Sequence, residues 1–207
     1  MAARQMRGIH SRQGKAAGRR VNRDPYVYAG TGVLRNKLGI TDAAELDAIE
    51  RQLVVQRTRE GLPDGDFDLA HLCAIHRQLF QDLYEWAGQL RTVEISKGAQ
   101  QFQFRRYIVT GIADIHRRLV DGNYLKGLDT TEFCQEAARI IGDINYAHPF
   151  REGNGRTQLQ YLDQLAKQAE HPIDIAQLQP RDWIEASRGA HNSDYEAMST
   201  AIFRALA

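Results

Sequence analysis

The sequence has few cysteines, few prolines and almost no net charge. Its 207 residues include 2 cysteines and 5 prolines, and 27 basic side chains nearly balance 26 acidic ones. Cys73 and Cys134 are too few for a disulfide framework or a zinc site, and each lies in an apolar helical pattern. They are predicted to be small core residues in a reducing compartment. A net charge of +1 argues against a broad nucleic-acid-binding face, and no apolar run is long enough to cross a membrane.

The first 23 residues differ from the rest of the chain in charge. They carry basic side chains and no acidic one. Such a block predicts a disordered, solvated tail over residues 1–23, and a DNA-binding arm is the alternative. Residues 24–207 have an ordinary globular composition and are predicted to form one domain. The basic residues of the tail are Arg4, Arg7, Arg12, Lys15, Arg19, Arg20 and Arg23.

Apolar residues recur at three- and four-residue spacing through most of the chain, which predicts helices. One interruption has a different pattern. Leu90–Ile95 alternates like a strand, Lys97-Gly98 resembles a turn, and 101–104 would be the returning strand. The predicted fold is therefore an all-α bundle with one β-hairpin, which needs support from the rest of the protein. Helices are predicted near residues 41–54, 68–87, 105–120, 131–147, after 155, at 180–188 and at 194–205.

The loop between two of these helices has a composition that packing alone does not explain. Gly153, Asn154 and Gly155 tolerate positive φ, so their amides can form a concave anion site at the start of the next helix. Arg156 is disfavoured at a helix N-terminus unless an anion is bound there. A phosphate chain is the obvious candidate.

Two further side chains of this loop suggest group transfer. Glu152 would repel a phosphate, but Mg²⁺ binds one or two carboxylates together with phosphate oxygens. The unperturbed pKa of a histidine such as His148 is near 6.5, so a neutral imidazole is available at pH 7 to take a proton from a hydroxyl. Base, metal carboxylate, anion site and arginine together indicate phosphoryl or nucleotidyl transfer. Phe150 is predicted to anchor the loop in the core.

The same residues resemble a known family. HPFREGNGRTQ closely matches the Fic motif, HxFx(D/E)GNGRxxR, and the stretches Ile75–Arg91 and Asp24–Ile40 also resemble Fic domains of small bacterial toxins. The resemblance covers residues 24 to about 205. It implies a Fic-fold helical bundle whose hairpin is a flap that pairs with an extended target segment.

The resemblance also implies a role for each matching residue. His148 would be the general base, and Glu152 would bind Mg²⁺. The cofactors would be ATP and Mg²⁺. The ATP phosphates would lie on Gly153, Asn154, Gly155 and Arg156, and the target would dock on the flap residues Ile95, Ser96, Lys97, Gly98 and Phe102.

The match fails at the last arginine of the motif, where this chain has Leu159. In the family that arginine orients ATP through its terminal phosphate. Losing such a contact costs about 1.5–3 kcal/mol, roughly ten- to a hundredfold in rate. Three interpretations stay open: a slow enzyme, another group on the terminal phosphate (Arg151, Arg105 or Arg106), or a degenerate chain that only binds nucleotide or protein.

The resemblance implies a protein adenylyltransferase that attaches AMP to a Ser, Thr or Tyr hydroxyl of another protein. Type II topoisomerase subunits, DNA gyrase or topoisomerase IV, are the first candidate targets, by analogy alone. A Doc-like phosphotransferase is the alternative enzyme, although Gly155 argues against it. The chain lacks an inhibitory string of the form [S/T]xxxE[G/N], which suggests a separate small antitoxin. The expected location is the bacterial cytoplasm, or a host cell if the chain is part of a delivered effector.

Overall fold

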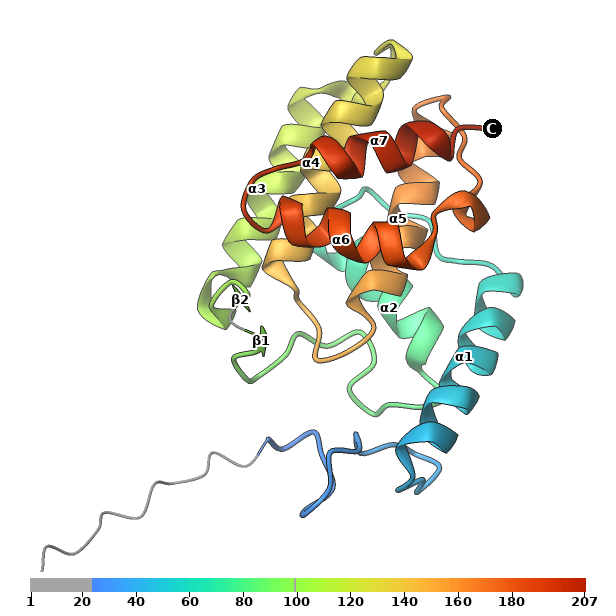
Figure 1. Cartoon of the computed structure of the whole chain (residues 1–207), viewed down its shortest axis with the longest axis vertical. Coiled ribbons are helices and arrows are strands. Elements are labelled where there is room, and N and C mark those ends of the chain that lie inside the picture. Colours follow the sequence, from blue (N-terminus) through green and yellow to red (C-terminus); the bar gives the residue numbers. More distant parts are fainter. Residues whose placement is uncertain (1–23, 99) are drawn as a thin grey trace, which may run out of the picture.

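The computed structural model describes residues 24–98 and 100–207, so the predicted tail of residues 1–23 lies outside the described residues. The described part contains seven α-helices, three short 3₁₀ segments and one two-stranded hairpin, which confirms the predicted fold class (Figure 1). None of these helices combines the length and the apolarity that a bilayer span requires. The helices are α1 (Ala43–Arg59), α2 (Leu69–Phe80), α3 (Ile108–Asp121), α4 (Thr130–Ala147), α5 (Asn154–Gln168), α6 (Pro180–Ala190) and α7 (Glu196–Arg204).

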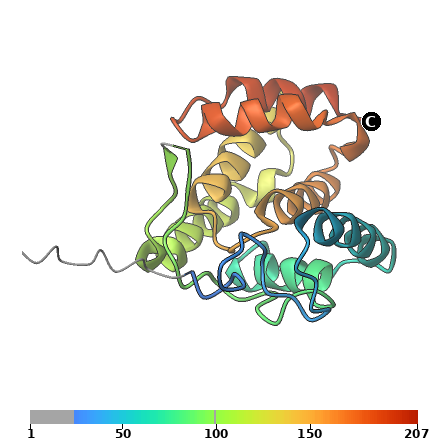
Figure 2. The ribbon, with the colours of Figure 1, turned by 60° about the horizontal axis from the view of Figure 1, so that its bottom comes forward.

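Helix α4 is the centre of the bundle. It packs against α3, α5, α6 and α7, and side chains such as Phe133, Ala137 and Ile141 are fully buried. Its start is fixed by a capping box, in which Asp129 accepts from the backbone of Glu132 and the Glu132 carboxylate accepts from the backbone of Asp129. Figure 2 shows α6 and α7 as one layer over α4, with α1 and α2 on the opposite side. The end of α4 is thus held inside the protein.

Helix α2 is shorter than the apolar pattern predicts. The expected helix over 68–87 ends at Phe80 and continues as a series of turns. Tyr84 stacks on Trp86 with 4.3 Å between ring centroids, and the amide of Gly88 donates to His76 Nδ1 at 2.8 Å. These tertiary contacts replace the hydrogen bonds of further helical turns. The apolar spacing of the sequence does not reveal the end of the helix, because periodicity alone cannot distinguish a helix from buried turns.

The predicted strand at Leu90–Ile95 is wrong. Its first residues bond to other loops: the amide of Arg91 donates to the carbonyl of Pro149, and the amide of Thr92 donates to the Tyr26 hydroxyl. At Ile95 the carbonyl accepts from the amide of Phe102 across the hairpin. The strands are instead β1 (Ser96–Lys97) and β2 (Gln100–Gln101), paired antiparallel. The hairpin itself is therefore confirmed, displaced along the chain by a few residues.

The hairpin packs against the end of α4, and a two-stranded hairpin of this size needs such support to be stable. Phe102, directly after β2, is 8% exposed, and its ring stacks on His148. The amide of Gln103 donates to the carbonyl of Tyr146 at 3.0 Å. These contacts place the hairpin over the loop that the sequence singled out. That loop is shorter than predicted, because α5 begins at Asn154.

Candidate active site

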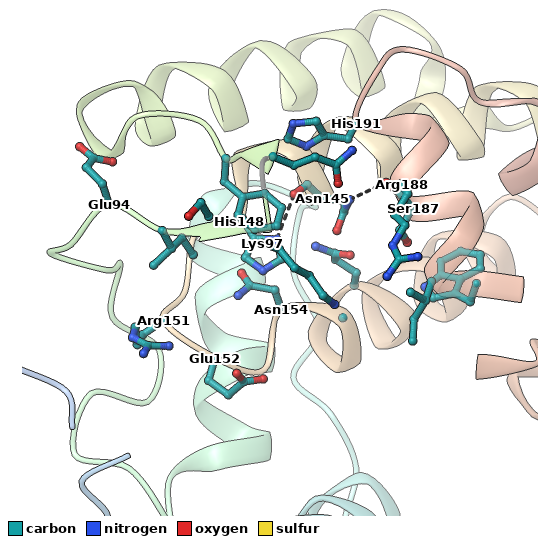
Figure 3. A pocket seen from close by; sticks show the side chains of 18 residues that line it. Glu94, Lys97, Asn145, His148, Arg151, Glu152, Asn154, Ser187, Arg188 and His191 are labelled. Carbon is teal, nitrogen blue, oxygen red and sulfur yellow. Dashed lines mark hydrogen bonds between the residues drawn. The ribbon is translucent and has the colours of Figure 1, made fainter. Parts of the chain in front are cut away.

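A cavity of about 540 Å³ lies between the hairpin, the end of α4, the start of α5 and helix α6. His148, Glu152, Asn154 and Gly155 line it, together with residues of the hairpin and of α6. Figure 3 shows His148, Asn154 and Glu152 along one side and Ser187 and Arg188 of α6 on the other. The structure therefore brings most of the predicted site residues to one cavity.

The conformation of His148 fixes the chemistry of its ring. His148 ends α4 in the left-handed region, with φ of 44°, an uncommon conformation for a residue with a side chain. Its Nδ1 lies 3.0 Å from the carbonyl oxygen of Asn145 (Figure 3). A carbonyl can only accept, so Nδ1 carries the hydrogen and Nε2 keeps a free lone pair.

The surroundings of His148 keep its ring neutral. Burial lowers the pKa of His148 to about 4, and the charges of Arg91 and Lys97 act in the same direction. The Phe102 ring covers one face of the imidazole, with 3.7 Å between centroids. At pH 7 Nε2 is therefore an acceptor that can take a proton.

The turn before α5 requires glycine at one position. Gly153 has φ of 81°, and a Cβ there would lie 2.4 Å from the Phe80 ring. The side chain of Asn154 closes the turn from inside, since Oδ1 accepts from the Phe150 amide and Nδ2 donates to the Phe150 carbonyl. Phe150 is fully buried, as predicted. Asn154 therefore braces the loop with its side chain, while its backbone amide, which has no acceptor among the described residues, stays free for a ligand.

The start of α5 presents free backbone donors. No side chain caps the helix, and among residues 24–98 and 100–207 the amides of Asn154, Gly155 and Arg156 have no acceptor. The amide of Gly153 differs, because it donates to Oε1 of Glu152 at 2.9 Å. The predicted anion site is thus open at three amides and closed at one by a carboxylate of the same loop.

Arg156 has an internal partner that the sequence argument missed. Its Nη2 lies 2.5 Å from Oε1 of Glu50 on α1 and 3.6 Å from Oε1 of Glu152. Its guanidinium also lies 4.8 Å from the centroid of the Phe80 ring. Arg156 does not line the cavity, so a bound anion is not needed to explain a cation there. Contact between Arg156 and phosphate stays a prediction.

Arg91 is a second residue that the sequence did not single out. Its side chain is completely buried, and it donates to the carbonyl of His148 at 2.8 Å and to the carbonyls of Val93 and Gln103. It therefore ties the base of the hairpin to the loop that carries His148. A lone arginine in an apolar stretch gives no sequence signal for this role.

His76 supports the same loop from beneath. Its Nδ1 accepts from the Gly88 amide, so Nε2 carries the hydrogen and donates to the carbonyl of Glu152 at 3.0 Å. The ring stacks on Phe150 at 3.9 Å, and burial lowers its pKa to about 4. His76 thus holds the backbone of Glu152 as a neutral donor.

The cations at the cavity differ from those considered in the sequence. Arg151 lines it but pairs with Asp24 at 2.8 Å. Arg105 and Arg106 do not line it. Among the described residues, Lys97 and Arg188 line the cavity without an acidic partner within 4.0 Å.

Leu159 lies outside the lining of the cavity. It is half-buried and packs against the core. The leucine therefore fits its apolar surroundings, and this packing does not depend on the role that the resemblance implies for the motif arginine.

A metal at this site would depend on a nucleotide. Within the described part of the chain no three His, Cys, Asp or Glu side chains form a cluster that could hold an ion. Glu152 is the carboxylate at the cavity beside the free amides of α5. One carboxylate plus phosphate oxygens fits the preference of Mg²⁺, so the residues present fit a magnesium-bound nucleotide.

Comparison with known proteins identifies the family. Residues 66–166 match the model of the Fic/DOC family. The chain is 40% identical over 184 residues to the probable protein adenylyltransferase y4lH of Sinorhizobium fredii, covering 88% of this chain and 96% of that protein. The chain belongs to the Fic/DOC family. It is also 39% identical to the protein adenylyltransferase VbhT of Bartonella schoenbuchensis, covering 88% of this chain and 39% of VbhT.

Solved structures of this family share the fold. BepC of Bartonella tribocorum with bound AMPPNP superimposes with a TM-score of 0.79 at 27% identity, covering 88% of this Fic chain and 96% of that one. A Fic domain of Bartonella quintana with bound ADP gives a TM-score of 0.79 at 28% identity, covering 87% and 93%. The predicted family and Fic fold are confirmed, and the similarity to these relatives supports the predicted enzyme class, protein adenylyltransferase.

Proposed function

We propose that this Fic protein transfers AMP from ATP to a hydroxyl group of a target protein at the cavity around His148. The observation that carries the proposal is the meeting of a free Nε2 lone pair with the free amides of Gly155 and its neighbours in one cavity. A proton acceptor beside an anion site is what nucleotidyl transfer to a hydroxyl needs. The relatives named as protein adenylyltransferases agree with this chemistry.

The proposed step can be written with its atoms. The hydroxyl oxygen of the target attacks the α-phosphorus of ATP, and its proton passes to Nε2 of His148. The bond between the α-phosphorus and the bridging oxygen breaks, and pyrophosphate leaves. The amides of Asn154 and Gly155 stabilise the charge on the phosphate oxygens. Bound at Glu152, Mg²⁺ would neutralise charge on the phosphate chain.

A labelling experiment tests the transferred group. The protein is incubated with Mg²⁺, a candidate target and ATP labelled at the α- or the γ-phosphate. Label from the α-phosphate alone is expected. Label from the γ-phosphate alone would show the Doc-like phosphotransferase, and no label with bound nucleotide would show a binding module. His148→Ala is expected to abolish the signal, whereas His116→Ala, on α3 and outside the cavity, should retain it.

We also propose that the target docks along the hairpin. Ser96, Lys97 and Gly98 are exposed, which leaves an edge for an added strand. Phe102 faces inward onto His148, so its role would be to position the ring, not to contact the target.

Ser96 lies opposite Gln101, next to the hydrogen-bonded pair of Ile95 and Phe102. The Ser96 amide therefore points to the free edge of the hairpin. Replacing Ser96 by proline, which removes that donor, should reduce transfer to protein and leave ATP affinity unchanged.

The target and the controlling partner stay predictions from family resemblance. A type II topoisomerase subunit is the first target to assay, and transfer to it should disappear with His148→Ala. A separate small antitoxin, if encoded beside this chain, should suppress transfer when co-purified. The bacterial cytoplasm and a host cell are the two locations to compare, since the solved relatives include translocated Bartonella effectors.

A further inference from the structure

Gln158 on α5 is a buried polar side chain without a partner. The residue is 2% exposed, and its Nε2 atom is buried with no hydrogen-bond acceptor among the described residues. Leaving such a donor unpaired costs stability comparable to a lost hydrogen bond. Buried amides are nearly always paired in folded proteins, so an unpaired one requires an explanation.

The position of Gln158 supplies that explanation. Gln158 lines the same cavity as His148 and Glu152. It lies four residues after Asn154, hence one turn further along α5 on the same face. One turn of helix is about 5.4 Å long, so the side chain reaches the space next to the free amides of Asn154 and Gly155.

The terminal amide can turn toward a ligand at little cost. The last torsion of a glutamine side chain is broad and roughly two-fold, so a half-turn exchanges nitrogen and oxygen. Nε2 can therefore face either the protein or the cavity. Nε2 of Gln158 has no hydrogen bond within the described part of the chain that would oppose this rotation.

We propose that Gln158 donates a hydrogen bond from Nε2 to an oxygen of the nucleotide's phosphate chain. The inference rests on the proposed nucleotide site and adds a donor that the family motif does not specify. The neighbouring amides of Asn154 and Gly155 are free donors within the described chain and can bind an anion. A neutral side-chain amide adds to them without another charge beside Arg151 and Lys97.

Gln158→Leu tests the proposal because it has opposite effects on stability and binding. Leucine has similar volume and no polar atoms, so the variant without nucleotide should melt about 2–4 °C higher than the wild type. Its affinity for AMPPNP with Mg²⁺, measured by calorimetry, should fall about tenfold or more, because a hydrogen bond to a charged group is lost. Its affinity for adenosine should stay unchanged.

Two further variants sharpen the test. Gln158→Glu keeps the shape but places a carboxylate near the phosphates, so it should weaken AMPPNP binding more than Gln158→Leu does. The matched control is Gln164→Leu, also on α5, whose amide donates to the carbonyl of Pro63 outside the cavity. The control should bind AMPPNP like the wild type.

The possible results are distinct. If the wild type does not bind AMPPNP, the proposed function and the role of Gln158 both fail. If the wild type binds and Gln158→Leu binds equally well, only the role of Gln158 is wrong. An equal loss of adenosine affinity would place the contact on the nucleoside and overturn the assignment to phosphate.

Discussion

Nη2 of Arg156 lies 2.5 Å from Oε1 of Glu50, joining the loop of the active site to helix α1. Glu50 also accepts from the hydroxyl of Tyr84, and its side chain is 9% exposed. Glu50 therefore holds Arg156 and is itself held by Tyr84. The guanidinium of Arg156 has a fixed place without nucleotide, which would lower the entropy lost in the predicted contact with the phosphates.

The first prediction concerns this pair. Glu50→Gln keeps the shape but removes the nearer of the two carboxylates beside Arg156 and leaves Glu152 at 3.6 Å. We expect a loss of about 1–2 kcal/mol in unfolding free energy, less than for a fully buried pair because Arg156 is partly exposed. The KM for ATP should rise severalfold, since the guanidinium is no longer fixed. Urea unfolding and initial rates measure the two effects. Asp47→Asn, in an exposed pair on the same helix, should change neither, and an unchanged KM in Glu50→Gln would refute the positioning role.

The second prediction concerns Arg91. Arg91→Lys keeps a charge but cannot reach the carbonyls of His148, Val93 and Gln103 together, since only the guanidinium is a planar fork. We expect a lower melting temperature and a kcat at least tenfold lower, because His148 loses its support. Arg117→Lys, on the exposed face of α3, is the control. Full activity in Arg91→Lys would mean that the loop holds its own shape.

The third prediction concerns acid pH. Burial lowers the pKa of both His148 and His76 from the ordinary 6.5 to about 4. Between pH 6.5 and 4 the unfolded chain therefore binds protons at these rings that the folded protein does not. Stability conferred by the two neutral rings is present above pH 6.5 and is lost as pH falls toward 4. The slope is up to about 1.4 kcal/mol per pH unit for each ring.

Urea unfolding at pH 7, 6 and 5 measures that slope. His148→Asn removes one of the two titrating rings and should make the dependence on pH clearly shallower. A variant with the same slope as the wild type would show that His148 is not kept neutral by the fold. Transfer activity should likewise persist below pH 6, since the base stays unprotonated in the folded protein.

The sequence predicts the helices well because their apolar faces repeat locally. The capped start of α4 and its buried face follow from residues 129–147 alone. The end of α2 and the strand at 90–95 do not, because distant partners decide them: His76 holds Gly88, and Pro149 bonds to Arg91. The spacing of apolar residues along a short segment carries no information about contacts with distant residues, so it cannot predict these two features.

The same division applies to the site. His148, Glu152 and the amides at the start of α5 are adjacent in sequence, so the motif predicts that they meet. Glu50, His76 and Arg91 reach the loop from other parts of the chain. Their roles need the tertiary structure, because single charged or histidine residues carry no positional signal.

The last prediction concerns the departure from the motif at Leu159. Leu159 lies three residues after Arg156 on α5, so a longer charged side chain there would extend from the same side of the helix. Leu159→Arg should raise AMP transfer about ten- to a hundredfold if the terminal phosphate lacks a cation in the wild type. Leu159→Gln is polar and uncharged, and it should give no such rise. If Leu159→Arg leaves the rate unchanged while ATP still binds, another group must hold the terminal phosphate. Lys97 and Arg188, the cavity cations without an acidic partner in the described chain, would then be the next to replace.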